Sequence, residues 1–137
     1  MRTELVTSHD GLTWGPGQVV LAPSSDGLPP DGAPWDGRWD ARGTRIAAVV
    51  EPAGGEAYAL YDGRASAAEN WFERTGLAVR QADGSLVPVG DAPVAQAPHG
   101  TGALRYACVV PLPDGRYRLF FEASKPDGAH DLRTQVI

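Results

Sequence analysis

Carboxylate side chains are the groups of this sequence best suited to transfer protons. Asp40 follows two tryptophans in the segment PWDGRWDARG, Asp62 ends an apolar run, and Glu69 lies in a loop before another such run. A carboxyl group in apolar surroundings has a raised pKa and can act as a general acid. This argument applies to Asp62, and Asp40, Glu69 and Asp62 together are the candidate catalytic residues.

Aromatic and guanidinium groups are suited to binding a polar ligand, because a guanidinium forms paired hydrogen bonds and an aromatic ring stacks. The candidate binding residues are Trp35, Trp39, Arg42, Arg64, His99, Arg105 and Glu122. A structural alternative stands beside this interpretation. The tryptophans could fill a gap between sheets, each burying roughly 200 Å², and recurring arginines could neutralise Asp62 and Glu122.

Two further residues have simpler interpretations. Glu73 precedes Arg74, and this pair predicts a surface ion pair worth less than about 1 kcal/mol. Cys108 is the single cysteine and lies in the apolar segment ACVV, which predicts a buried thiol. No spacing of cysteine and histidine resembles a zinc site. We therefore expect neither a metal nor a cofactor.

An internal repeat organises the chain. Residues 44–62 align without a gap on residues 104–122, an offset of about 60 residues. The alignment places Arg45 on Arg105 and Asp62 on Glu122. Each copy has two apolar runs separated by a turn that contains proline and glycine, which is typical of a β-hairpin.

Further apolar runs extend each hairpin to a four-stranded meander. Third strands are predicted at residues 3–8, 72–81 and 131–137, and fourth strands at residues 85–89 and within 12–21. The fold class is therefore all-β. Tandem four-stranded sheets are typical of a β-propeller. We predict one domain over residues 1–137, with the outer strands of one blade in 1–22, a complete blade in 38–90 and an incomplete blade in 100–137.

Four motifs carry a resemblance to a known superfamily. They are WDARGTRI at 39–46, YDGR at 61–64, ENWFERTG at 69–76 and the SHDGLTW hairpin at 8–14. Together they resemble the five-bladed β-propeller glycosidases, which include arabinosidase/xylosidase, invertase-like and mannoside-phosphorylase families. The resemblance implies hydrolysis of glycosidic bonds by paired carboxylates in a full-length parent, with Asp40 as a stabilising or pKa-setting acid.

The resemblance has one departure. An essential aspartate of those enzymes lies on the first blade, and no equivalent residue is expected here. Whether this chain is itself an enzyme is therefore left open, and the alternative function is a non-catalytic carbohydrate-binding or scaffold remnant of the fold.

Composition limits the partners. The net charge is −5 and only one lysine, Lys125, accompanies eleven arginines, so no basic surface for nucleic acid is expected. No apolar run approaches the roughly 18 residues that span a bilayer, and we expect no membrane partner and a cytoplasmic location. The expected ligand is a carbohydrate, and open blade edges predict self-association.

Overall fold

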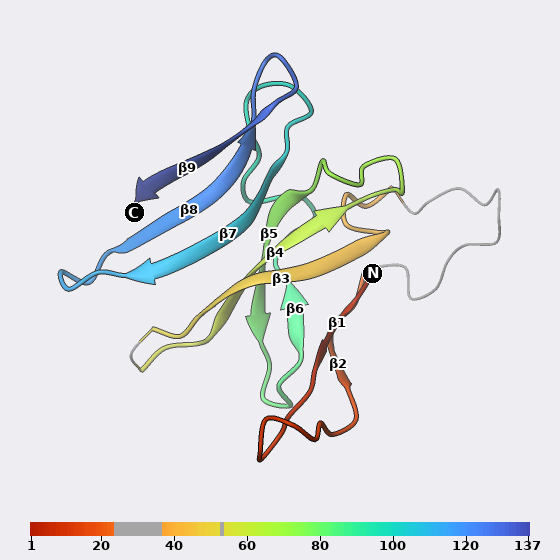
Figure 1. Ribbon diagram of the computed structural model, residues 1–137, viewed down its shortest axis with the longest axis vertical. Helices are drawn as coiled ribbons and strands as arrows, with labels where there is room; N and C mark the ends of the chain where they lie inside the picture. Colours follow the sequence, from red (N-terminus) through yellow and green to blue (C-terminus); the bar gives the residue numbers. More distant parts are fainter. Residues whose placement is uncertain (24–36, 53) are drawn as a thin grey trace.

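The computed structural model describes residues 1–23, 37–52 and 54–137, which form nine β-strands and no helix (Figure 1). The all-β prediction is confirmed. The strands form three antiparallel sheets of two, four and three strands, and this grouping matches the predicted outer strands, complete meander and incomplete meander.

The four-stranded sheet lies in the middle of the chain. It contains β3 (Gly43–Val50), β4 (Tyr58–Arg64), β5 (Arg74–Arg80) and β6 (Leu86–Pro88) in sequence order. Each strand pairs with the next one along the chain, so the sheet is a meander.

Two smaller sheets flank it. The two-stranded sheet contains β1 (Thr3–Leu5) and β2 (Gln18–Leu21), and the three-stranded sheet contains β7 (Leu104–Pro111), β8 (Tyr117–Ser124) and β9 (His130–Val136). The strand predicted over residues 3–8 ends early, at Leu5. The chain then enters a turn in which Asp10 Oδ1 accepts hydrogen bonds from the backbone N–H groups of Leu12 and Thr13, both at 2.8 Å.

The repeat is visible in the register of the strands. Arg45 lies opposite Asp62 in the β3–β4 pair, and Arg105 lies opposite Glu122 in the β7–β8 pair. Both pairs have a register shift within the next few residues, between Ile46 and Ala48 in β3 and between Arg105 and Cys108 in β7. Because a bulge re-aims the residues that follow it, the two copies share a local distortion as well as a sequence pattern.

Neighbouring sheets are joined by the same two contacts. The Thr44 N–H donates to the Met1 carbonyl at 3.0 Å, and the Leu104 N–H donates to the Glu73 carbonyl at 3.1 Å. The Thr3 and Thr75 hydroxyls then donate to the carbonyls of the same two residues, Thr44 at 3.4 Å and Leu104 at 2.8 Å. β3 is thus fixed to the start of β1, and β7 to the start of β5, in the sheet that precedes each of them.

The apolar core lies between the two-stranded and four-stranded sheets. Leu21, Trp39, Tyr61 and Ala78 are buried there, and the Trp39 and Tyr61 rings stack with centroids 5.5 Å apart. A glycine lies beneath each ring. A Cβ at Gly63 would come within 2.3 Å of Trp39, and a Cβ at Gly76 within 2.3 Å of Tyr61.

The prediction for Cys108 is wrong, because this residue is exposed. Side chains of a strand alternate between the two faces of its sheet. In β7 the preceding residue, Ala107, is the buried one, so Cys108 points to the opposite face. The apolar segment around Cys108 gave no indication of which residues would face inward.

Candidate ligand-binding site

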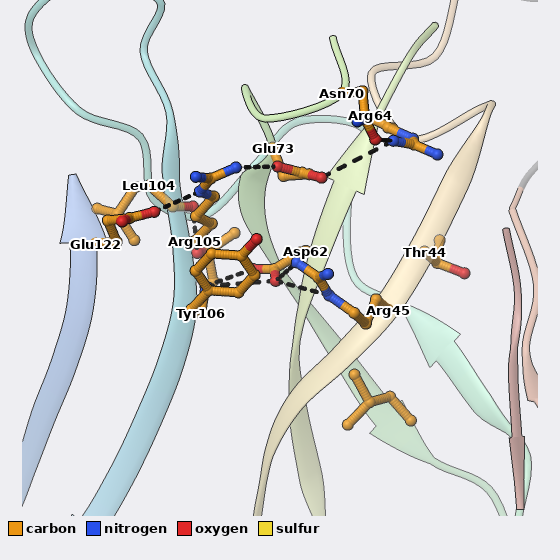
Figure 2. A network of polar contacts seen from close by, with 12 residues as sticks. Thr44, Arg45, Asp62, Arg64, Asn70, Glu73, Leu104, Arg105, Tyr106 and Glu122 are labelled. Atoms are coloured by element: carbon orange, nitrogen blue, oxygen red, sulfur yellow. Dashed lines mark hydrogen bonds and ion pairs between the residues drawn. The ribbon is translucent and has the colours of Figure 1, made fainter. Parts of the chain in front are cut away.

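A network of charged side chains joins the four-stranded and three-stranded sheets (Figure 2). Its first part is an ion pair within the β3–β4 hairpin. Arg45 donates two hydrogen bonds to Asp62 Oδ2, from Nη2 at 2.8 Å and from Nε at 3.3 Å. Asp62 is 0% exposed, and its Oδ1 also accepts the backbone N–H of Tyr106 at 3.1 Å. This carboxylate therefore ties β4 to β7.

The second part is centred on Arg105. Its Nε donates to Glu122 Oε2 at 2.6 Å within its own sheet, and its Nη1 donates to Glu73 Oε2 at 3.0 Å in the neighbouring sheet. The other Glu73 oxygen, Oε1, lies 4.0 Å from Arg64 Nη1, and Arg64 also donates to Asn70. The chain of contacts thus runs from Glu122 to the loop between β4 and β5.

Two aromatic residues lie at the surface of this network with unusual backbones. Trp71 has φ 87° and Tyr106 has φ 56°, a conformation that costs of the order of 1–3 kcal/mol for a residue other than glycine. Trp71 is 61% exposed and Tyr106 is 42% exposed. Strain of this size persists only where the surrounding structure holds the residue in place.

Arginines lie against both rings. The Arg105 guanidinium carbon is 4.6 Å from the centroid of Tyr106 and 5.7 Å from that of Trp71. The Arg45 guanidinium carbon is also 4.6 Å from the Tyr106 centroid. These are cation–π distances, so contacts with the two arginines help to hold the rings in place.

Sequence reasoning did not select Trp71 or Tyr106. For Tyr106 the repeat offered a signal. This position holds an aromatic residue in the second copy but the aliphatic Ile46 in the first, so the two copies differ there. For Trp71 it was the segment ENWFERTG, which occurs once in the chain. Neither signal indicates a positive φ.

The tryptophans that were selected lie elsewhere. Trp35 falls outside the described residues. Trp39 is buried in the core against Tyr61, which is the structural alternative given above. Asp40 is also buried, where it accepts hydrogen bonds from the Tyr61 hydroxyl at 2.9 Å and from Arg38 Nε at 3.4 Å.

The two glutamates of the β4–β5 loop have different surroundings. Glu69 was selected as the acid, but its Oε2 accepts hydrogen bonds from Arg74 Nη2 at 2.9 Å and from the Ala65 N–H at 2.8 Å. The prediction of a Glu73–Arg74 surface pair is wrong, because Glu73 is 3% exposed and bonds to Arg105. The partner of Glu73 lies on another sheet, so adjacency in sequence was misleading.

The remaining candidates lie at strand entrances. His99 is exposed in the loop before β7, and its carbonyl accepts the Ser124 hydroxyl at 2.6 Å. Arg42 precedes β3, and its N–H donates to the Arg64 carbonyl at 2.9 Å. Four of the predicted site residues belong to one network in the structure: Asp62, Arg64, Arg105 and Glu122.

The pKa values of the two buried acids of the network are shifted in opposite directions. Desolvation raises the pKa of Asp62 and outweighs the hydrogen bonds from Arg45 and the Tyr106 N–H. Desolvation also opposes ionisation of Glu73. There it is outweighed by the residue's own backbone N–H together with the hydrogen bond and charge of Arg105, so the pKa of Glu73 is lowered.

These shifts predict opposite changes in the pH dependence of stability. Glu73, with a lowered pKa, stabilises the fold above its ordinary pKa, and this contribution is lost on acidification. Asp62, with a raised pKa, binds its proton more tightly in the folded state than in the unfolded state. Its contribution to stability therefore increases as the pH falls through this raised pKa. We expect Glu73→Gln to flatten the acid loss of stability and Asp62→Asn to steepen it. Urea unfolding of both variants between neutral and acidic pH measures these slopes, and parallel slopes would contradict the assignment.

The fold and the network define an all-β chain with a buried ion cluster between two sheets and two exposed, strained aromatic rings above it. Comparisons with protein-family models, curated proteins and solved structures gave no match. Within the described ranges, histidine, cysteine and acidic side chains form no group of three that could hold a metal ion. Those ranges also contain no helix able to cross a membrane.

Proposed function

We propose that this chain binds carbohydrate without cleaving it, on the surface formed by Trp71, Tyr106 and the arginines beneath them. The observation that carries this proposal is the exposure of two aromatic rings on positive-φ backbones. Backbone strain of this kind is concentrated at binding sites, where the conformation serves to aim a side chain.

A saccharide matches the chemistry of this surface. The apolar C–H face of a sugar ring packs on an aromatic ring, and its hydroxyls accept hydrogen bonds from guanidinium groups. The ion cluster holds three arginines, Arg45, Arg64 and Arg105, and three carboxylates, Asp62, Glu73 and Glu122. Their formal charges cancel, which favours a neutral polar ligand.

We further propose that the sheets are arranged radially, as in a β-propeller. The support is the repetition of both inter-sheet contacts, from Thr44 and Leu104 to the strand before them. A heterologous contact that recurs with the same geometry generates a ring or a helix. In a ring, the innermost strands β3 and β7 would carry Arg45 and Arg105 near the axis.

Burial of the carboxylates favours binding over hydrolysis. Asp40, Asp62 and Glu73 are all buried, and each accepts hydrogen bonds from protein donors. An acid that protonates a glycosidic oxygen must reach it within hydrogen-bond distance. Glycoside hydrolysis is the second candidate function, and the raised pKa of Asp62, caused mainly by burial, is the observation that favours it.

Calorimetric titration with neutral xylo-, arabino- and manno-oligosaccharides tests the proposal. We expect binding by the unchanged chain, and about tenfold weaker binding after either Trp71→Ala or Tyr106→Ala, because each ring supplies roughly 1 kcal/mol of stacking beyond its buried area. Trp14→Ala is the matched control. Trp14 is also exposed but lies in the hairpin between β1 and β2, so its loss should leave the affinity unchanged.

The results separate the two candidate functions. Unchanged affinity in both Trp71→Ala and Tyr106→Ala would contradict the binding surface. Release of the aryl group from aryl glycosides by the unchanged chain, abolished in Asp62→Asn, would instead support hydrolysis. Activity that persists in Asp40→Asn would remove Asp40 from that mechanism.

A further inference from the structure

β9 is the longest of the strands that end the three sheets, and its outer edge is free. β9 spans seven residues and pairs with β8 alone, at the outer side of the three-stranded sheet (Figure 1). The strands that end the other two sheets are shorter, because β2 has four residues and β6 has three, the last of them Pro88. The edge strands β3 and β7 are longer, but backbone N–H groups of both already bond to the neighbouring sheet. Proline and short length are the usual protections of an edge strand, and β9 has neither.

The hydrogen bonding of β9 shows which of its backbone groups face outward. Tyr117 and Ile137 exchange both backbone hydrogen bonds at 2.9 Å, and the Ala129 carbonyl accepts the Lys125 N–H at 2.8 Å. The odd-numbered residues of β9 therefore direct their N–H and C=O groups toward β8. Because these groups alternate along an antiparallel strand, those of His130, Leu132, Thr134 and Val136 point to the free edge.

The side chains at the middle of β9 are complementary to themselves. Asp131 and Arg133 lie on one face, since Arg133 Nη2 is 3.4 Å from Asp131 Oδ2, and both are partly exposed. Between them Leu132 points to the other face and is 79% exposed. A second β9 placed antiparallel, with Leu132 opposite Leu132, brings each Asp131 opposite an Arg133.

We propose that β9 is an interface with a second copy of this chain, in which two β9 strands pair antiparallel about a two-fold axis at Leu132. The outward N–H and C=O groups of Leu132 then form a hydrogen-bonded pair with those of the second copy. Two Asp131–Arg133 pairs flank it on one face, and the two leucines cover each other on the opposite face. The same strand is used by both copies, as in most symmetric dimers.

Charge favours the Leu132-centred register over the register shifted to Arg133. A shift that centres the axis on Arg133 uses the same outward backbone groups but places two Arg133 side chains opposite each other. Like charges directly opposite are destabilising across strands, whereas opposite charges stabilise. The Leu132-centred register therefore has both backbone and charge complementarity.

A pair of charge-reversal variants tests the interface. In Asp131→Arg every cross-strand pair becomes Arg opposite Arg, and in Arg133→Asp it becomes Asp opposite Asp. We expect the unchanged chain to sediment as a dimer at micromolar concentration. Each variant alone should dimerise at least about tenfold more weakly, because two attractive pairs become repulsive.

Mixing the two variants restores the complementarity. Position 131 of each then faces an opposite charge at position 133 of the other, so the equimolar mixture should again form a dimer. Arg116→Asp is the control, because Arg116 is equally charged but lies in the exposed turn between β7 and β8. A monomeric unchanged chain, dimers that persist in either variant alone, or a mixture that stays monomeric would overturn the proposal.

A cross-link at the uncharged residue Leu132 tests the register directly. In a Cys108→Ser background, Leu132→Cys should form a disulfide-linked dimer on mild oxidation. The Cα atoms of a hydrogen-bonded antiparallel pair are about 5.5 Å apart, within the range that a disulfide bridges. Arg133→Cys in the same background should cross-link more slowly, and the reverse order would contradict the Leu132-centred register.

Discussion

Replacing Arg105 by alanine is expected to lower the free energy of unfolding by about 3–5 kcal/mol, the usual cost of removing one partner from a buried ion pair. The Arg105 side chain is 7% exposed and bonds to Glu73, whose side chain is 4% exposed. After the change the Glu73 carboxylate stays buried, 4.0 Å from Arg64 but without its hydrogen-bonded cation. The effect is therefore a penalty for isolated charge and a loss of the contact between two sheets.

Chemical denaturation of matched variants measures this effect. Arg116→Ala removes an exposed pair with Asp114, and it should cost less than about 1 kcal/mol. The double change Arg105→Met with Glu73→Gln removes both charges together and should recover part of the loss. A loss at Arg105→Ala no larger than that at Arg116→Ala would show that the network contributes little to stability.

Replacing Gly76 by alanine is expected to destabilise the chain by about 3 kcal/mol, at the upper end of the cost of overpacking a core. A Cβ at this position would lie 2.3 Å from Tyr61 Cζ and 2.7 Å from its hydroxyl oxygen. The ring has no room to retreat, because it is fully buried, stacks on Trp39 and donates its hydroxyl proton to Asp40. The methyl group therefore displaces a buried hydrogen bond as well as a ring.

Thermal and urea unfolding give the size of this loss. Gly15→Ala is the control, since a Cβ there meets no atom closer than 3.5 Å, and its effect should stay within about 0.5 kcal/mol. Equal stability of the two alanine variants would show that Tyr61 is less tightly held than the structure indicates.

The fold was predictable where local pattern determines structure. Alternating apolar runs with a Pro/Gly turn form a hairpin whatever surrounds them, and the offset that aligns Arg45 with Arg105 identified equivalent strands. The same alignment gave the structural alternative for Asp62 and Glu122, and both do pair with those arginines. Strand lengths were less predictable, because the turn centred on Asp10 shortens β1.

The surface of the candidate site was not predictable in the same way. Exposure of Trp71 and Tyr106 depends on a backbone conformation with positive φ that L-residues rarely adopt. The residue types at these two positions do not predict that conformation. Burial of Glu73 and of Trp39 depends on contacts between sheets. Such contacts join residues far apart in the chain, so they cannot be predicted from the residues next to Glu73 or Trp39 in the sequence.

The recurring threonine contacts have a consequence for how stability is distributed. The two-stranded sheet contacts the four-stranded sheet through Thr3 and Thr44, and the four-stranded sheet contacts β7 through Thr75 and Leu104. Modules coupled mainly to their neighbours behave as a linear array, in which a local loss of free energy fades with each boundary it crosses. Damage in β2 should therefore loosen the strand pairing of β3 well before that of β8.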